Sequence, residues 1–189
     1  MLRLPARHIP NLISIARIFL VLPVVEALLT RQFDRALVWF TVAGLSDGVD
    51  GFLARYFGWQ SRLGSYLDPI ADKLLLVSSY LGLAWLGLIP GWLAALVIAR
   101  DGIIFLGALA YYFLLEPFDG QPSLLSKLNT FCQLLLVFVI LVQPHWPHLS
   151  TAGIPTLVGA VTLTTTLSGL LYVLTWSRRY WQRRRHLSV

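Results

Sequence analysis

Four aspartates at fixed spacing are the residues of this chain best suited to chemistry. Asp47 and Asp50 are three positions apart, and Asp68 and Asp72 are four positions apart. On a helix, both spacings place the two carboxylates on one face. Two such faces in contact would form a cage of carboxylates, whose mutual repulsion a cation must offset. Because oxygen-only ligands favour hard divalent ions, the spacing predicts a site for Mg²⁺ or Mn²⁺.

Other residues of the same stretch suit a phosphate-bearing ligand. Gly51 and Gly64 lack side chains, so backbone or a bound molecule can approach the cage closely. Arg55 follows Asp50 by five positions, and its guanidinium can pair bidentately with a phosphate or anchor the end of its helix. Both interpretations of Arg55 stay open at this point.

Residues 47–72 resemble the signature of the CDP-alcohol phosphotransferase (CDP-alcohol phosphatidyltransferase) family of integral membrane enzymes. The matching pattern is Asp47-x2-Asp50-Gly51-x2-Ala54-Arg55-x8-Gly64-x3-Asp68-x3-Asp72. The resemblance implies two divalent metal ions held by the four aspartates, with Asp72 acting as the base. It also implies a CDP-linked donor bound at the metals beside Gly51, Ala54, Arg55 and Gly64. A homodimer is a further expectation from the family.

The composition indicates a polytopic membrane protein. Hydrophobic residues make up 57% of the 189 residues and charged residues 13%, with a mean hydropathy of +0.70. We expect one all-α domain over residues 1–189. Apolar runs of spanning length predict six transmembrane helices, over residues 12–30, 36–55, 69–88, 91–115, 125–143 and 153–176. The second and third carry the aspartates, and carboxylates within a membrane are costly and usually functional.

The first apolar run has an alternative interpretation. Arg3 and Arg7 precede it, as basic residues precede the apolar core of a secretory signal peptide. The run contains Arg17 and Glu26, however, and no clear cleavage site of small residues follows it. An uncleaved first span is therefore the favoured prediction.

Lysine and arginine positions predict the orientation. With the N-terminus inside, the cytoplasmic segments hold Arg3, Arg7, Arg55, Arg62, Lys127, Arg178, Arg179, Arg183, Arg184 and Arg185. The opposite side then has Arg31 and Arg35, which agrees with the positive-inside rule. We expect the metal site at the cytoplasmic end of the second and third helices, in the inner membrane if the protein is bacterial. The basic tail is expected to contact anionic lipid headgroups rather than nucleic acid.

Four further polar residues are candidates for binding the acceptor. Arg100 lies in the fourth predicted span and Lys127 at the start of the fifth, and each has a structural role as its alternative. Asn11 and Arg17 belong to the stretch Pro10-Asn11-x2-Ser14-x2-Arg17, which is similar to the opening stretch of many family members.

The family resemblance implies transfer of a phosphatidyl group from CDP-diacylglycerol to a hydroxyl, with release of CMP. The stretch Ser126-Lys127-Leu128-Asn129-Thr130 resembles the CMP-forming cardiolipin synthases, whereas phosphatidylglycerophosphate synthases commonly show Lys-x-Lys-Thr here. Asn129 in place of a second lysine favours a singly charged lipid over a near-dianionic monoester. We therefore expect phosphatidylglycerol as the acceptor, with glycerol 3-phosphate as the alternative.

Two other classes of protein are alternatives to an enzyme. A transporter with an acidic cation site would place its carboxylates near the midplane between inverted repeats, and the sequence shows neither feature. An inactive relative would have no need for an intact set of four aspartates. Release of CMP distinguishes the enzyme from both.

Overall fold

The computed structural model describes residues 9–58, 62–114, 123–146 and 153–187, with side chains for most of them. The described part is helical, without strands. Its helices are α1 (Ile9–Leu29), α2 (Phe33–Tyr56), α3 (Arg62–Trp85), α4 (Gly91–Leu114), α5 (Leu124–Val142) and α7 (Gly153–Leu187). The all-α prediction is confirmed for this part of the chain, and each predicted range corresponds to one observed helix.

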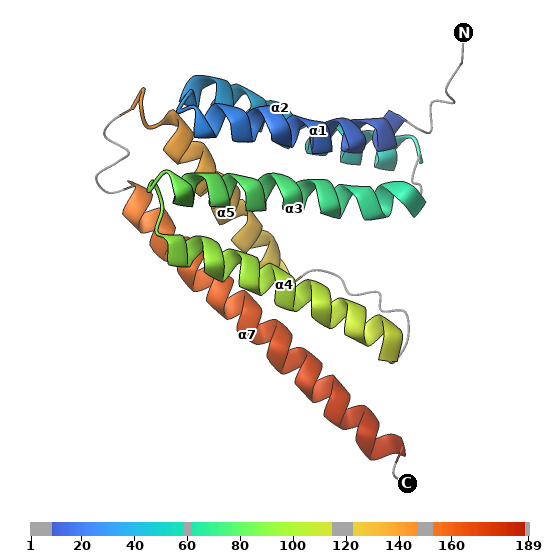
Figure 1. The fold of residues 1–189 in the computed structure, drawn as a ribbon. Helices are drawn as coiled ribbons and strands as arrows, with labels where there is room; N and C mark the ends of the chain where they lie inside the picture. The colour runs from blue at the N-terminus through green and yellow to red at the C-terminus, as the bar shows by residue number, and fades with distance from the viewer. Residues whose placement is uncertain (1–8, 59–61, 115–122, 147–152, 188–189) are drawn as a thin grey trace.

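The helices form two groups that share one apolar core. In Figure 1, α1, α2 and α3 lie side by side with nearly parallel axes, α5 passes behind α3, and α4 and α7 run obliquely to them. α1 packs mainly on α2 and α3, while α7 packs on α5 and α4. Fully buried side chains from four helices fill the interior: Val24, Leu28, Leu83, Val97 and Leu136. A Cβ at Gly82 would lie 3.2 Å from Leu28 Cδ1, so the glycine lets α1 and α3 approach closely.

Three helical stretches are long and apolar enough to cross a membrane. They are Asn11–Leu29, Leu124–Val142 and Gly153–Thr175. Large apolar side chains such as Phe19 and Leu22 on α1 point outward, as they do on a surface that faces lipid. The full set of six spans remains a prediction.

Two helices extend furthest beyond their predicted bounds. α3 begins at Arg62 rather than at residue 69, because hydropathy locates the apolar run and not the polar turns before it. Asp68 and Asp72 therefore both lie within α3, on successive turns. α7 continues to Leu187 rather than ending at 176, since its arginines are good helix formers. Its 35 residues span about 52 Å, more than the roughly 30 Å hydrocarbon core of a bilayer.

Two helices end in the same left-handed cap, once with glycine and once with arginine. After α3, Gly87 has φ +72°, and the Leu88 N–H donates to the Leu83 carbonyl at 2.9 Å. After α1, Arg31 has φ +57°, and the Gln32 N–H donates to the Ala27 carbonyl at 2.8 Å. Glycine normally occupies this position because it has no Cβ.

This pair of caps makes a stability prediction. We expect Arg31→Gly to stabilise the protein and Gly87→Ala to destabilise it, each by about 1 kcal/mol. The measurement is the midpoint of thermal unfolding in detergent for the two variants and the native protein. An Arg31→Gly variant that unfolds at a lower temperature than the native protein would contradict the assignment of strain to Arg31.

Candidate active site

One face of α1 is polar, although the rest of the helix is apolar apart from Glu26. Asn11, Ser14 and Arg17 recur at every third position, and all three side chains are buried. At 3.6 residues per turn, a spacing of three keeps successive side chains on neighbouring parts of one helix face. Because α1 packs on α2 and α3, this polar face meets the two helices that carry the aspartates.

Arg17 joins three of the four aspartates. Its Nη1 donates to Asp47 Oδ1 at 2.8 Å and also to Asp72 Oδ1, and its Nη2 donates to Asp50 Oδ2. The Arg17 side chain is fully buried and that of Asp50 is 2% exposed, whereas Asp47 and Asp72 are 48% and 47% exposed. The cluster is therefore closed at Asp50 and open to solvent at Asp47 and Asp72.

Ser14 connects the fourth aspartate. Its hydroxyl donates to Asp68 Oδ1 and lies 3.4 Å from Asp50 Oδ2. Two side chains of α1 thus link carboxylates of α2 and α3, and the predicted metal site at the four aspartates stays a prediction. Sequence reasoning did not single out Ser14, although its spacing from Asn11 and Arg17 placed it on the same face of α1.

The four aspartates supply the type of ligand that hard divalent ions prefer. Four ionised carboxylates and one guanidinium leave three negative charges uncompensated among these side chains. An all-oxygen set of this kind suits Mg²⁺ or Mn²⁺. As placed, no three acidic, histidine or cysteine side chains of the described residues are arranged to hold a metal, and the Arg17 guanidinium lies between the carboxylates. The four carboxylates therefore fit divalent metals as ligands by their chemistry. To bind the metals, the carboxylates must turn away from Arg17.

The predicted donor-binding residues lie on the same two helices. Gly51 follows Asp50 in α2 and is partly buried. Ala54 and Arg55 lie one turn further along α2, and Gly64 lies near the start of α3. The side chains of Ala54 and Arg55, and the surroundings of Gly64, are outside the described residues, so the roles of these residues stay predictions.

A second polar network ties four helices together. The buried Arg100 of α4 donates to Asp101 Oδ1 at 2.7 Å, to Ser126 Oγ of α5 at 2.7 Å and to Ser168 Oγ of α7 at 2.6 Å. Lys73 of α3, the residue after Asp72, forms an ion pair with Asp101. The structure thus places Arg100 outside the aspartate cluster and connects it to α3 through Asp101 and Lys73.

Asn129 corrects one argument made from the sequence. That argument set Asn129 beside Lys127, in place of a second lysine that would bind an anion. Asn129 is instead fully buried, and its Oδ1 accepts hydrogen bonds from Thr164 at 2.9 Å and Thr165 at 2.8 Å. Because residues two positions apart on a helix diverge by about 200°, Lys127 is exposed while Asn129 faces α7. The inference from Asn129 to the acceptor is wrong.

The position of Asn129 predicts how a lysine would behave there. We expect Asn129→Lys to destabilise the protein by about 3 kcal/mol, because it buries an ammonium between α5 and α7 without a partner. Leu128→Lys is the matched control, since Leu128 is exposed on the same turn. Thermal unfolding in detergent measures both. Equal stability of the two lysine variants would contradict the burial of Asn129.

Comparison with known proteins identifies the family. The model of the CDP-alcohol phosphatidyltransferase family matches residues 7–176. A probable CMP-forming cardiolipin synthase of Drosophila melanogaster is 34% identical over 88% of this chain and 56% of the relative. The CMP-forming cardiolipin synthase of Rattus norvegicus is 35% identical over 87% of this chain and 60% of its own.

A probable phosphatidylglycerophosphate synthase of Mycobacterium tuberculosis is 32% identical over 74% of this chain and 65% of the relative. The chain thus spans between about half and two thirds of the length of these relatives. The match of the family model covers the polar face of α1, both aspartate pairs and the Arg100 network. The chain therefore belongs to the CDP-alcohol phosphatidyltransferase family.

Proposed function

We propose that this protein is a membrane enzyme that transfers a phosphatidyl group from CDP-diacylglycerol to a hydroxyl acceptor and releases CMP. The observation that carries the proposal is the convergence of the four aspartates on one cluster that opens at Asp47 and Asp72. The match to the family model over the same residues supports it. Catalysis of this kind depends mainly on placing and neutralising phosphate charge, which such a cluster is suited to do.

Asp72 is the base in this proposal. Its carboxylate is exposed at the open side of the cluster, where an acceptor hydroxyl could approach it, whereas Asp50 is buried. The acceptor oxygen attacks the phosphorus that carries diacylglycerol, its proton passes to Asp72, and the phosphoanhydride bond to CMP breaks. Arg17 and Ser14 hold the carboxylates of α2 and α3 close together before the metals bind.

Two divalent ions, Mg²⁺ or Mn²⁺, would be held by Asp47, Asp50, Asp68 and Asp72. They would supply positive charge opposite the diphosphate of the donor and the departing CMP. The donor would lie along Gly51, Ala54, Arg55 and Gly64, with Arg55 on a phosphate. The acceptor would be bound by Asn11, Arg17, Arg100 and Lys127. Arg17 would act from within the aspartate cluster, and Arg100 would act through its hydrogen bond to Ser126.

We propose phosphatidylglycerol as the acceptor, which would make the product cardiolipin. The names of the fly and rat relatives favour this acceptor, and the name of the mycobacterial relative favours glycerol 3-phosphate. Lys127 is exposed at the start of α5, and the single positive charge of its ammonium suits the singly charged diester of phosphatidylglycerol.

The proposal includes an orientation and an assembly. The enzyme would span the membrane six times as a homodimer, with both termini and the aspartate cluster on the cytoplasmic side. The excess of arginine in the predicted cytoplasmic segments supports this orientation.

The acceptor is tested by direct competition. The purified protein, in mixed micelles with CDP-diacylglycerol and Mg²⁺ or Mn²⁺, is given phosphatidylglycerol and glycerol 3-phosphate at matched concentrations, and both lipid products are quantified. We expect cardiolipin to exceed phosphatidylglycerophosphate. If the native protein converts glycerol 3-phosphate faster, phosphatidylglycerophosphate synthesis replaces cardiolipin synthesis as the function.

A further inference from the structure

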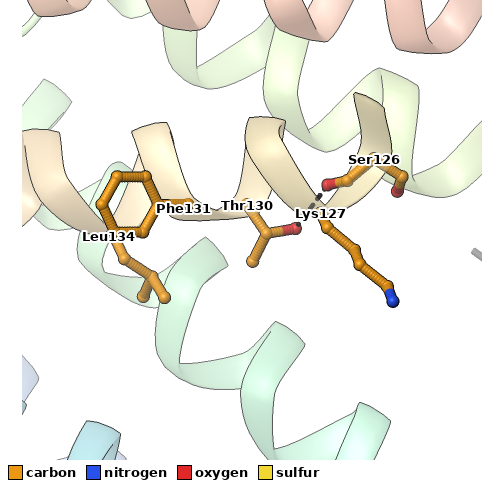
Figure 2. Close-up of a pocket in the computed structure, with 5 residues that line it drawn as sticks. All are labelled: Ser126, Lys127, Thr130, Phe131 and Leu134. Carbon is orange, nitrogen blue, oxygen red and sulfur yellow. Dashed lines mark hydrogen bonds between the residues drawn. The ribbon is translucent and has the colours of Figure 1, made fainter. Parts of the chain in front are cut away.

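A groove on the outer face of α5 has a polar and an apolar half. Its lining consists of Ser126, Lys127, Thr130, Phe131 and Leu134, and its volume is about 400 Å³. In Figure 2, Lys127 extends from the start of the helix, while Phe131 and Leu134 lie further along it. Spacings of three and four residues put Lys127, Phe131 and Leu134 on one face of α5. The groove therefore runs from a cation and two hydroxyls to an aromatic and an aliphatic side chain.

This gradient is complementary to one class of ligand. A phospholipid carries an anionic phosphate and an acyl chain, and the groove presents Lys127 to the first and Phe131 with Leu134 to the second. Lys127 is the only charged side chain among the five described residues that line the groove. Thr130 donates its proton to the Ser126 carbonyl at 3.2 Å, so its hydroxyl does not donate to a phosphate, and Lys127 carries that contact. A small anion such as glycerol 3-phosphate would use the polar half alone.

The polar half of the groove is tied to the helix that carries the base. Ser126 Oγ accepts a hydrogen bond from Arg100, Arg100 pairs with Asp101, and Asp101 pairs with Lys73. Lys73 directly follows Asp72 in α3, and α3 also packs on α5. The polar half of the groove is thus linked through three side chains to Lys73, the residue that follows Asp72.

We propose that this groove binds the phosphate and one acyl chain of the anionic phospholipid acceptor, and so selects a diacylated acceptor over a water-soluble one. The inference rests on the proposed function, because it assigns the lipid acceptor of that reaction to α5. Lys127 determines the affinity for the phosphate, and Phe131 with Leu134 determines the requirement for an acyl chain.

Two variants test the two halves of the groove. Leu134→Trp fills the apolar half and Lys127→Gln removes the cation. We expect each to raise the KM for phosphatidylglycerol about tenfold, with kcat and the KM for CDP-diacylglycerol unchanged. Leu128→Trp is the matched control, because Leu128 is exposed on α5 but does not line the groove. An unchanged KM for phosphatidylglycerol in both groove variants, or the same rise in the control, overturns the proposal.

A binding measurement separates the groove from the reaction. The native protein in nanodiscs is labelled with phosphatidylglycerol or phosphatidylcholine that carries a photoreactive acyl chain, and the labelled peptides are mapped. We expect labelling of the peptide around Phe131 by phosphatidylglycerol, reduced at least about fivefold by Lys127→Gln. Equal labelling by phosphatidylcholine would mean that the lipid contact is non-specific. Protection of the peptide by a second copy of the chain would mean that this face is a dimer interface. Either outcome overturns the proposal that the groove binds the acceptor. If the peptide is labelled as expected but the protein forms no cardiolipin, the proposed function is refuted while the binding of an anionic phospholipid in the groove stands.

Discussion

Asp72→Asn is expected to lower the rate of CMP release by at least about 100-fold, because asparagine keeps the shape of the side chain but cannot take up a proton. The Arg17 contact can survive the change, since an amide oxygen still accepts the hydrogen bond that Arg17 Nη1 donates to Asp72 Oδ1. A loss of rate without a loss of stability would therefore report on the chemistry of Asp72, as base and metal ligand, rather than on the fold. The measurements are CMP release from CDP-diacylglycerol at saturating acceptor and thermal unfolding of the same preparation.

The control for this experiment is Asp34→Asn. Asp34 is an exposed acid of α2 that pairs with His145 outside the cluster, at 2.7 Å. We expect Asp34→Asn to keep nearly the native rate. If Asp72→Asn releases CMP at a rate close to that of the Asp34 variant, Asp72 is not the base.

Arg17→Met is expected to lower the stability of the metal-free protein by about 3 kcal/mol, since it leaves the buried Asp50 without its charged partner. Among the described side chains, Arg17 is the one cation that contacts the aspartate cluster. Divalent ions would replace part of the missing charge. We therefore expect Mg²⁺ or Mn²⁺ to raise the unfolding temperature of this variant by more than that of the native protein.

Arg35→Met provides the comparison, because Arg35 is an exposed arginine of α2 away from the cluster. Its unfolding temperature in a chelator should stay close to the native value. Should Arg17→Met also unfold at the native temperature in a chelator, the guanidinium does not hold the aspartates together. An equal response to metal in the variant and the native protein would argue that the ions bind elsewhere.

The aspartate cluster was predictable because its geometry is local. Pairs three or four residues apart must share a helix face, so the two acidic faces followed from the spacing of Asp47 with Asp50 and of Asp68 with Asp72. The contact between the two faces depends on hydrogen bonds from α1, and these join residues that are far apart in the sequence. The regular spacing of Asn11, Ser14 and Arg17 signalled a polar face, but no local rule states that Arg17 would reach carboxylates of both α2 and α3.

Side-chain direction limited the prediction of α5. Lys127 and Asn129 are close in sequence, which suggests that both face one anion site. On the helix, however, their side chains point about 200° apart. Lys127 lines the groove on the exposed face, and Asn129 is buried on Thr164 and Thr165. The start of α3 was missed for a related reason, since hydropathy reports the apolar turns of a helix and not its polar first turns.

Release of CMP from CDP-diacylglycerol by the purified protein is the most direct test of the central claim, that the aspartate cluster carries out metal-dependent phosphatidyl transfer. The assay compares four mixtures, with and without phosphatidylglycerol and with and without Mg²⁺ or Mn²⁺, and repeats them with Asp50→Asn. We predict CMP only when both acceptor and metal are present, and at least about 100-fold less with Asp50→Asn, because that change removes a ligand charge from the cluster. CMP release at the native rate in a chelator, or from the Asp50 variant, would contradict the claim.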